Sequence, residues 1–432
     1  MAVPLHQPVL APIQAGMVSK LLDREAAVAS IPEEEWRSVA RRFALLALLV
    51  VGITAHAVQF YLSLRQFESG PPVAPTTYVA RFTEIAATEG RPYRDFPVEY
   101  PPVSLAAIEV AAGPNGNETG AHMVWLILIC DLATVAALSY GWGPRTAVAY
   151  LFLTAPLLGF LYTTIDLIAV ALAVGAVALV VRGRDRLGGV ALAAAILAKV
   201  WPLVLVPMMV LERKRRALVW SSASLAFGTF VWVWWGGASG LVQVATQRQT
   251  PGWEYESLVG SVIWALGRKF VIINDSTRVG VAPGWAKAML LVAALAGIAA
   301  VWYRASRRRP PELGFPAVAA ISILMLSAPL LSPPYMIWLA PWAAIAWMER
   351  SGYVRWLLGA LMLVSGLMFL AFSSEYLYYH AVWSVKAILL LRNALLAAVP
   401  AVYLLERRTP SAGPVAPTAS GTRLKIRPSA SS

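Results

Sequence analysis

The sequence is poor in the residues from which metal sites and disulfides are built. It has one cysteine, Cys130, and four histidines, His6, His56, His122 and His380, among 432 residues. A lone cysteine forms no intrachain disulfide and no cysteine metal cluster, and the histidines lack the spacing of zinc ligands. We therefore expect no metal site and no cofactor.

Charged residues are also scarce. They make up 14% of the chain against 58% hydrophobic residues, and the mean hydropathy is +0.63. Soluble domains do not have this composition, and the repeated apolar runs of membrane-spanning length predict an all-α polytopic membrane protein. The net charge of +13 marks the loops that stay in the cytoplasm, so we expect no nucleic-acid partner.

We also expect no cleavable signal peptide, because the first forty residues are mixed and polar and the first apolar run is long enough to span a bilayer. Basic clusters divide the chain into a cytoplasmic N-terminal tail (1–42), a transmembrane domain (43–405) and a disordered basic cytoplasmic tail (406–432). If successive apolar runs cross the membrane in alternating directions, nearly every dense basic cluster lies on the same side of the membrane. The path holds about ten spans: 43–64, 121–140, 147–162, 167–181, 217–235, 287–302, 315–330, 336–347, 356–372 and a last span ending at 405.

An apolar run at 187–211 has basic clusters at both ends and Lys199-Val-Trp-Pro in its middle. We predict a broken hairpin of two short helices that reaches toward an internal cavity, because irregular backbone at membrane depth needs such cover. Lys199 either meets an anion there or pairs with Asp131 or a backbone carbonyl. Asp166 begins a span, where it either faces the outer cavity or caps its helix. Arg392, in the last span, is expected to snorkel to the interface.

The most polar segment of the outer face is residues 91–102, RPYRDFPVEYPP, which we call the strap. Its prolines predict a rigid, extended, non-helical segment, and a solvated connecting loop is the alternative. An amphipathic helix is expected at 76–89 before the strap. A helix at 103–112 follows, too short to cross the bilayer at about 1.5 Å per residue. The loop 236–284, with short helices at 257–266, and the turn 332–335 are predicted on the same outer face.

Several stretches, in order, resemble glycosyltransferase family 87, membrane enzymes of the GT-C fold that include polyprenyl-phosphate-mannose-dependent α-mannosyltransferases. The strap is similar to the PYRDF…EYPP segment of actinobacterial members, and the likeness extends over roughly residues 42 to 347. The other matching stretches are IDL at 165–167, RGR at 182–184, GG at 188–189, KVWP at 199–202, EYESL at 254–258 and LSPPY at 331–335.

The sequence departs from the family pattern at two places. The first outer loop of the family carries an acid proposed as the catalytic base, but residues 70–78 here read GPPVAPTTY, and Glu68 is the acid nearest the end of the first span. Pro334 stands where the family has a glutamine in its SPQY turn.

The resemblance implies a GT-C-like bundle of about 10–12 transmembrane helices in a bacterial, actinobacterial cell membrane, with its active site on the outer face. It implies an enzyme that moves a sugar, mannose being the family's example, from a polyprenyl-phosphate donor to a lipid- or polysaccharide-linked acceptor. Membrane lipid is then the other expected partner.

Such chemistry needs cations for the leaving phosphate and a base within about 3 Å of the acceptor hydroxyl. The candidate phosphate-binding residues are Lys199, Arg94 and Arg91, and the candidate catalytic carboxylates are Asp95, Glu99 and Glu68. The candidate substrate-binding residues are Tyr100, Asp166, Trp253, Glu256 and Tyr335.

Among the carboxylates, Asp95 and then Glu99 are preferred as the base. Glu68 adjoins a flexible Ser-Gly pair, and a helix dipole would lower the basicity of Asp166. Asp95 and Glu99 are held between prolines, and on an extended backbone they would lie about 13 Å apart with their side chains on the same side.

Two other function classes remain open. A lipid-linked-sugar transporter or flippase would also have many spans and a polar cavity, but it more often shows internal repeats, which the sequence does not display. A catalytically degenerate relative would bind a lipid-linked sugar without transferring it, and the missing loop acid favours that alternative. An enzyme should have a pocket open to the outer face and sideways to lipid.

Overall fold

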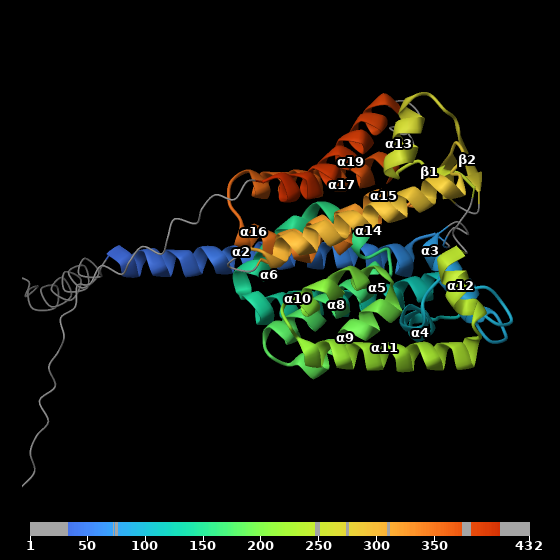
Figure 1. Cartoon of the computed structure of the whole chain (residues 1–432), viewed down its shortest axis with the longest axis horizontal. Helices are drawn as coiled ribbons and strands as arrows, with labels where there is room; N and C mark the ends of the chain where they lie inside the picture. Colours follow the sequence, from blue (N-terminus) through green and yellow to red (C-terminus); the bar gives the residue numbers. More distant parts are fainter. Residues whose placement is uncertain are drawn as a thin grey trace, which may run out of the picture.

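The computed structural model of the chain is a bundle of helices with a small sheet at one end (Figure 1). It describes residues 33–71, 73, 77–246, 251–273, 276–308, 312–373 and 382–406. Nearly all of the two predicted tails, residues 1–32 and 407–432, lies outside the described residues.

Helices occupy the predicted spans, which confirms the all-α polytopic fold class. They are α2 (Glu33–Ser69), α5 (Gly116–Trp142), α6 (Pro144–Thr154) with η1 (Ala155–Leu157) and α7 (Leu158–Leu161), α8 (Asp166–Val181), α11 (Arg215–Gly236), α14 (Gly284–Ser306), α15 (Gly314–Ser327), α16 (Ala340–Glu349), α17 (Tyr353–Ser373) and α19 (Val382–Leu405). By length and composition, 6 helices within the described residues are able to cross a membrane. The remaining predicted spans, such as α8 and α15, are shorter apolar helices buried within the bundle.

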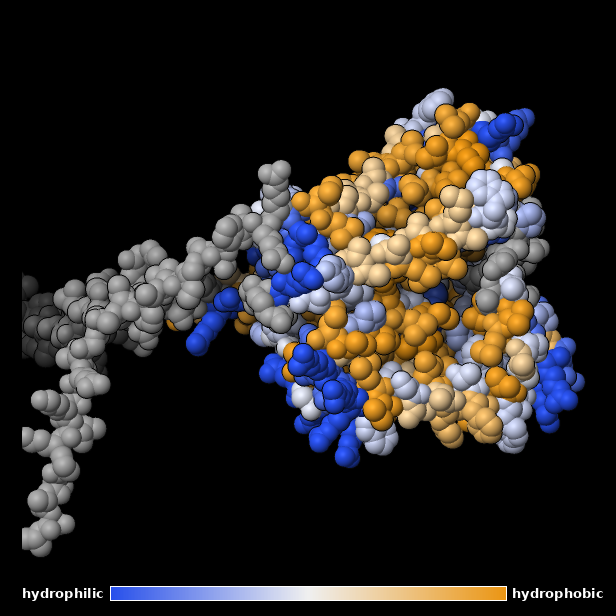
Figure 2. Space-filling model, in the orientation of Figure 1, coloured by the Kyte–Doolittle hydropathy of each residue, from blue (hydrophilic) through white to orange (hydrophobic). Residues whose placement is uncertain are grey.

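Short elements gather at the end of the bundle opposite to the one from which α2 projects (Figure 1). They are α3 (Tyr78–Ala87), α4 (Pro102–Ala111), α12 (Ser239–Thr246), α13 (Leu258–Ala265), β1 (Trp253–Glu254), β2 (Phe270–Ile273) and β3 (Ser276–Val279). The helices confirm the amphipathic, short and loop helices expected from the sequence. Hydrophobic residues cover the flank of the bundle and hydrophilic residues collect near its ends (Figure 2), as a lipid environment requires.

The three strands form an antiparallel sheet in the order β1-β3-β2, which the sequence analysis did not predict. Trp253 and Phe270 both pair with Val279 of the central strand. The strands are too short to show an alternating pattern, so only the tertiary pairing reveals them.

The predicted broken hairpin is present as α9 (Asp185–Ala198), η2 (Trp201–Leu205) and α10 (Val206–Leu211). α9 packs closely against α11, and a Cβ at Gly189 would lie 2.4 Å from the carbonyl oxygen of Ala217. The absent side chain therefore allows the two helix backbones to approach.

A polar network is buried between α2, α5 and α6. The Asp131 carboxylate accepts hydrogen bonds from the hydroxyls of Tyr150 (2.8 Å) and Tyr162 (3.0 Å) and lies 2.6 Å from Nδ1 of His56. Nε2 of His56 lies 3.1 Å from the Thr154 hydroxyl. Asp131 is thus held by partners in its own network, and the alternative in which Lys199 pairs with Asp131 is wrong.

Candidate functional site

The break in the hairpin falls at Lys199, as the sequence predicts. Helix α9 ends at Ala198, and Lys199 has extended backbone angles (φ −158°, ψ 142°) before Pro202 enters η2. The hydroxyl of Ser104, from α4, donates a 2.7 Å hydrogen bond to the Ala198 carbonyl. This bond satisfies a carbonyl at the helix end and ties the break to the segment that follows the strap.

The Lys199 ammonium forms an ion pair with Asp166, the first residue of α8. The same carboxylate oxygen accepts a 2.6 Å hydrogen bond from the indole nitrogen of Trp338 in η3 (Pro333–Trp338). Two donors from distant segments thus fix Asp166, which is buried. A quarter of the Lys199 side chain stays exposed, so the ammonium is held in place without being sealed off.

Aromatic rings surround this ion pair. The Lys199 ammonium lies 4.6 Å from the ring centre of Tyr335 and 5.0 Å from that of Trp338. Tyr335 and Trp338 stack at 4.3 Å, and Trp201 stacks on Trp338 at 5.5 Å. Cation–π attraction holds the ammonium of Lys199 against these rings. We call Asp166, Lys199, Trp201, Tyr335 and Trp338 the lysine site.

Two buried polar groups, each two residues in sequence from a member of the ion pair, have no hydrogen-bond partner among the described residues. They are the indole nitrogen of Trp201, a residue 4% exposed, and the hydroxyl of Thr164, two residues before Asp166. A buried donor left unpaired costs roughly 1–3 kcal/mol, so native proteins seldom keep one without a use. A lysine and an unpaired indole N–H, close together beside stacked rings, are suited to an anionic oxygen attached to a group with an apolar or sugar face.

The strap is a turn followed by an extended segment, so the prediction of a wholly extended strap is wrong. The amides of Arg94 and Asp95 both donate to the carbonyl of Arg91, and the Tyr93 amide donates to the Phe96 carbonyl. Tyr93 has a φ of 68° in the left-handed region. The Asp95 carboxylate closes the turn by accepting a 2.7 Å hydrogen bond from the Arg91 amide.

The predicted residues of the strap lie in different surroundings. Arg91, Arg94 and Asp95 are exposed. Glu99 forms a 3.0 Å ion pair with Arg81 of α3, a partner that the sequence analysis did not single out. Tyr100 is buried, with its ring edge-on to another aromatic ring and its carbonyl accepting the hydroxyl of Tyr93. The separation of about 13 Å that an extended backbone would give Asp95 and Glu99 stays a prediction.

In the second outer loop, Trp253 and Glu256 are 4% and 6% exposed. The Trp253 indole donates a 2.9 Å hydrogen bond to the Val281 carbonyl. Arg392 of α19 lies 3.5 Å from the Glu256 carboxylate and donates a 2.6 Å hydrogen bond to its carbonyl. Arg392 is 0% exposed, so the expectation that it snorkels is wrong. Burial raises the pKa of Glu256 well above its usual range, although Arg392 opposes this.

A cavity of about 650 Å³ opens among the end of α2, α3 and the start of α5. Its lining includes Glu84, Asn115 and Asn117 but, within the described part of the chain, none of the residues predicted for the site. Glu68 is exposed in the last turn of α2. The structure therefore has a pocket beside α3 that the sequence did not locate.

Of the predicted residues, the tertiary structure brings Lys199, Asp166 and Tyr335 together. The loop with Trp253 adjoins the segment that leads to Tyr335, because the Glu254 amide donates a 3.0 Å hydrogen bond to the Pro329 carbonyl. Trp338 and Trp201 were missed. The three-residue spacing from Tyr335 to Trp338, which puts both rings on one face of a helical turn, is a signal that would have found the first.

The model of a known family, glycosyltransferase family 87, matches residues 99–333. Among solved structures, the crystal structure of ArnT from Cupriavidus metallidurans bound to undecaprenyl phosphate is similar at 14% identity and a TM-score of 0.43. That similarity covers 82% of this chain and 76% of ArnT. No curated protein matches the chain.

Proposed function

Because the chain belongs to glycosyltransferase family 87, and is therefore a multi-pass membrane glycosyltransferase of the GT-C fold, we propose that it transfers mannose from a polyprenyl-phosphate donor. The acceptor is a hydroxyl of a lipid- or glycan-linked molecule on the outer face of an actinobacterial cell membrane. A lipid-borne donor suits a site at membrane depth, since its polyprenyl chain stays in the bilayer while its phosphate reaches the protein.

The observation that carries the proposal is the lysine site. Lys199 is a cation at a helix break and is partly exposed. Its ammonium and the Trp201 ring both contact Trp338, and the indole N–H of Trp201 has no hydrogen-bond partner among the described residues. In the transfer, the acceptor oxygen bonds to the anomeric carbon while the bond from that carbon to the phosphate oxygen breaks. The electron pair leaves with the phosphate, where Lys199 and the indole N–H stabilise the added charge. Asp166 acts as a positioning residue that aims the ammonium.

The acceptor hydroxyl must also lose its proton to a base. We propose Asp95 first, because its exposed carboxylate is held by one backbone hydrogen bond at Oδ2 and keeps its other oxygen for a substrate. Glu99 is second, since Arg81 engages its carboxylate, and Glu68 is third. Arg91 and Arg94 flank Asp95 on the exposed turn and would attract the donor phosphate on its way in.

For the sugar we propose that Tyr335 presents its ring face beside the phosphate. Tyr100, Trp253 and Glu256 are buried by protein contacts, which supports a role in holding the strap and the loop 236–284 in place. Their replacement should then change acceptor use through folding of the loop, and not through loss of a direct contact.

The test is an assay of the purified full-length chain with synthetic polyprenyl-phosphate mannose and a membrane extract as the acceptor source. Lys199→Ala should weaken donor binding at least tenfold, and Lys269→Ala, which removes an exposed lysine of the outer loop, should not. Asp95→Asn should stop transfer while donor binding persists.

The same assay separates the alternatives. Donor binding without transfer by the wild type, across the available sugars and acceptors, would identify a catalytically degenerate binder. Movement of the donor across a vesicle membrane without formation of a glycosidic bond would identify a transporter. Unchanged donor binding by Lys199→Ala would remove the phosphate role of the lysine site.

A further inference from the structure

Two basic turns meet at the end of the bundle opposite to the sheet. One turn joins α8 to α9 and carries Arg182, Arg184 and Arg186, and the other joins α10 to α11 at residues 213–216. The Lys214 ammonium of the second turn lies 3.5 Å from the Val180 carbonyl in the last turn of α8, just before the first. A cavity of about 220 Å³ opens between the turns.

The cavity carries a surplus of positive charge. Its lining includes three arginines, Arg184, Arg186 and Arg216, against one carboxylate, Asp185. Within the described residues, no arginine of the two turns forms an ion pair with a carboxylate. The contacts that do occur use other partners, such as Arg186 over the Trp220 ring at 5.9 Å. Like charges held this close repel one another unless an anion from outside joins them.

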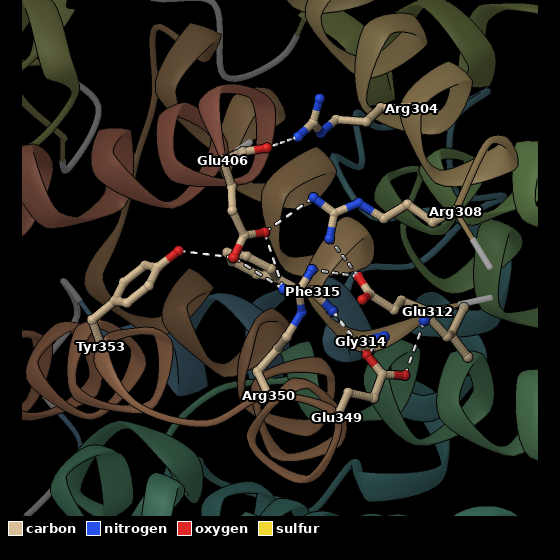
Figure 3. Close-up of polar contacts among 10 residues, drawn as sticks. Arg304, Arg308, Glu312, Gly314, Phe315, Glu349, Arg350, Tyr353 and Glu406 are labelled. Carbon is tan, nitrogen blue, oxygen red and sulfur yellow. Dashed lines mark hydrogen bonds and ion pairs between the residues drawn. The ribbon is translucent and has the colours of Figure 1, made fainter. Parts of the chain in front are cut away.

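A second basic cluster on the same chain shows the contrast. Arg308 and Arg350, at the ends of other helices, both pair with Glu312 and with Glu406 at 2.6–3.1 Å (Figure 3). Tyr353 adds a 2.8 Å hydrogen bond to Glu406. The chain thus neutralises the Arg308–Arg350 cluster with its own carboxylates. Within the described residues, the arginines of the cavity form no such ion pairs. The positive-inside tendency accounts for basic loops but not for this difference.

Apolar side chains lie next to the cations. Leu187 lines the cavity and is 57% exposed, and Val190, one turn further along α9, is exposed as well. Hydrophilic residues at the bundle end adjoin the hydrophobic flank in Figure 2. A ligand for this surface needs an anionic group for the arginines and an apolar part for the flank.

We propose that this cavity binds the phosphate headgroup of an anionic membrane phospholipid, with an acyl chain along Leu187 and Val190. Basic pockets between helix ends at a membrane surface have the chemistry for such headgroups. The site is separate from the lysine site and does not depend on the proposed transfer reaction.

The test uses the full-length protein in neutral detergent micelles, titrated with phosphatidylglycerol or phosphatidylcholine and followed by thermal unfolding and native mass spectrometry. Phosphatidylglycerol should bind saturably and raise the unfolding midpoint, and phosphatidylcholine should not. The double variant Arg184→Gln/Arg216→Gln should bind phosphatidylglycerol about 30-fold more weakly, since each arginine near an anionic surface contributes about 1 kcal/mol.

The matched control is Arg42→Gln/Arg145→Gln, which removes the same charge from two exposed arginines outside the cavity and should keep the affinity within about twofold. If both double variants lost affinity for phosphatidylglycerol equally, general surface charge would explain the binding, and the proposed site would be wrong. Inorganic phosphate is added in a separate arm. If it bound at the cavity with the same affinity as the lipid and displaced it, the ligand would be free phosphate and the lipid proposal would be wrong.

Discussion

Replacing Arg392 by methionine should destabilise the chain strongly, because Arg392 is the buried cation that anchors the second outer loop to α19. The variant removes the charge 3.5 Å from the Glu256 carboxylate and the 2.6 Å hydrogen bond to the Glu256 carbonyl. The Asn393 amide keeps a 3.2 Å hydrogen bond to that carbonyl, so part of the anchor remains.

The magnitude follows from burial and distance. Two unit charges 3.5 Å apart attract by about 5 kcal/mol at an effective dielectric constant near 20. Removing one partner of a buried pair typically costs about 3–5 kcal/mol. We expect Arg392→Met to lower the free energy of unfolding by about 3 kcal/mol, at the low end of this range. The reason is that Glu256 becomes neutral by taking up a proton, so that no unpaired charge stays buried.

This uptake of a proton gives the prediction a pH dependence. Burial already raises the pKa of Glu256 well above its usual range, and loss of Arg392 raises it further. A carboxyl group with a raised folded pKa stabilises the fold when protonated, and this contribution falls as pH rises from the unfolded pKa to the folded one. Arg392→Met should therefore be relatively more stable at acidic pH than at neutral pH.

The assay is equilibrium unfolding in mixed micelles, followed by tryptophan fluorescence. Adding Glu256→Gln to Arg392→Met should recover about 2 kcal/mol, because the unpaired carboxylate is then gone. Lys386→Met is the control on the same helix, since its ammonium faces the rings of Trp264 and Trp383 at 5.2 and 4.7 Å; it should cost about 0.5–1 kcal/mol. A cost below about 1 kcal/mol for Arg392→Met, or no recovery in the double variant, would show that the pair does not anchor the loop.

Three further predictions concern other contacts. Asp131→Ala should cost about 3–5 kcal/mol in unfolding free energy, since it strips the buried His56 and two tyrosine hydroxyls of their acceptor; a cost under about 1 kcal/mol would contradict a stabilising network. Ser104→Ala should weaken donor binding about threefold to tenfold by loosening the Ala198 carbonyl beside Lys199, and unchanged titrations would disprove that link. Burial raises the pKa of Glu312 from 4.5 to about 7, against the lowering effect of Arg308. The stability of the wild type should therefore fall relative to that of Glu312→Gln as the pH rises from about 4.5 to about 7. Unfolding midpoints measured against pH will show this fall.

The sequence alone determined the features that depend on local pattern. Long apolar runs and one-sided basic clusters located the spanning helices, because the bilayer imposes length and charge on each segment separately. The break at Lys199 followed from Trp-Pro inside an apolar run, since proline removes a helix hydrogen bond at its own position.

Only the tertiary structure decided which polar groups meet. By pattern, Lys199 was free to pair with Asp131 or a backbone carbonyl, and Asp166 was free to face a cavity or to cap its own helix. The turn at Arg91 arises from a hydrogen bond to the Asp95 side chain, a choice that proline spacing does not specify. Arg392 is buried because Glu256 and Asn393 supply its partners. A buried charge is stable only beside its partner, and that partner is set by packing between segments far apart in the chain.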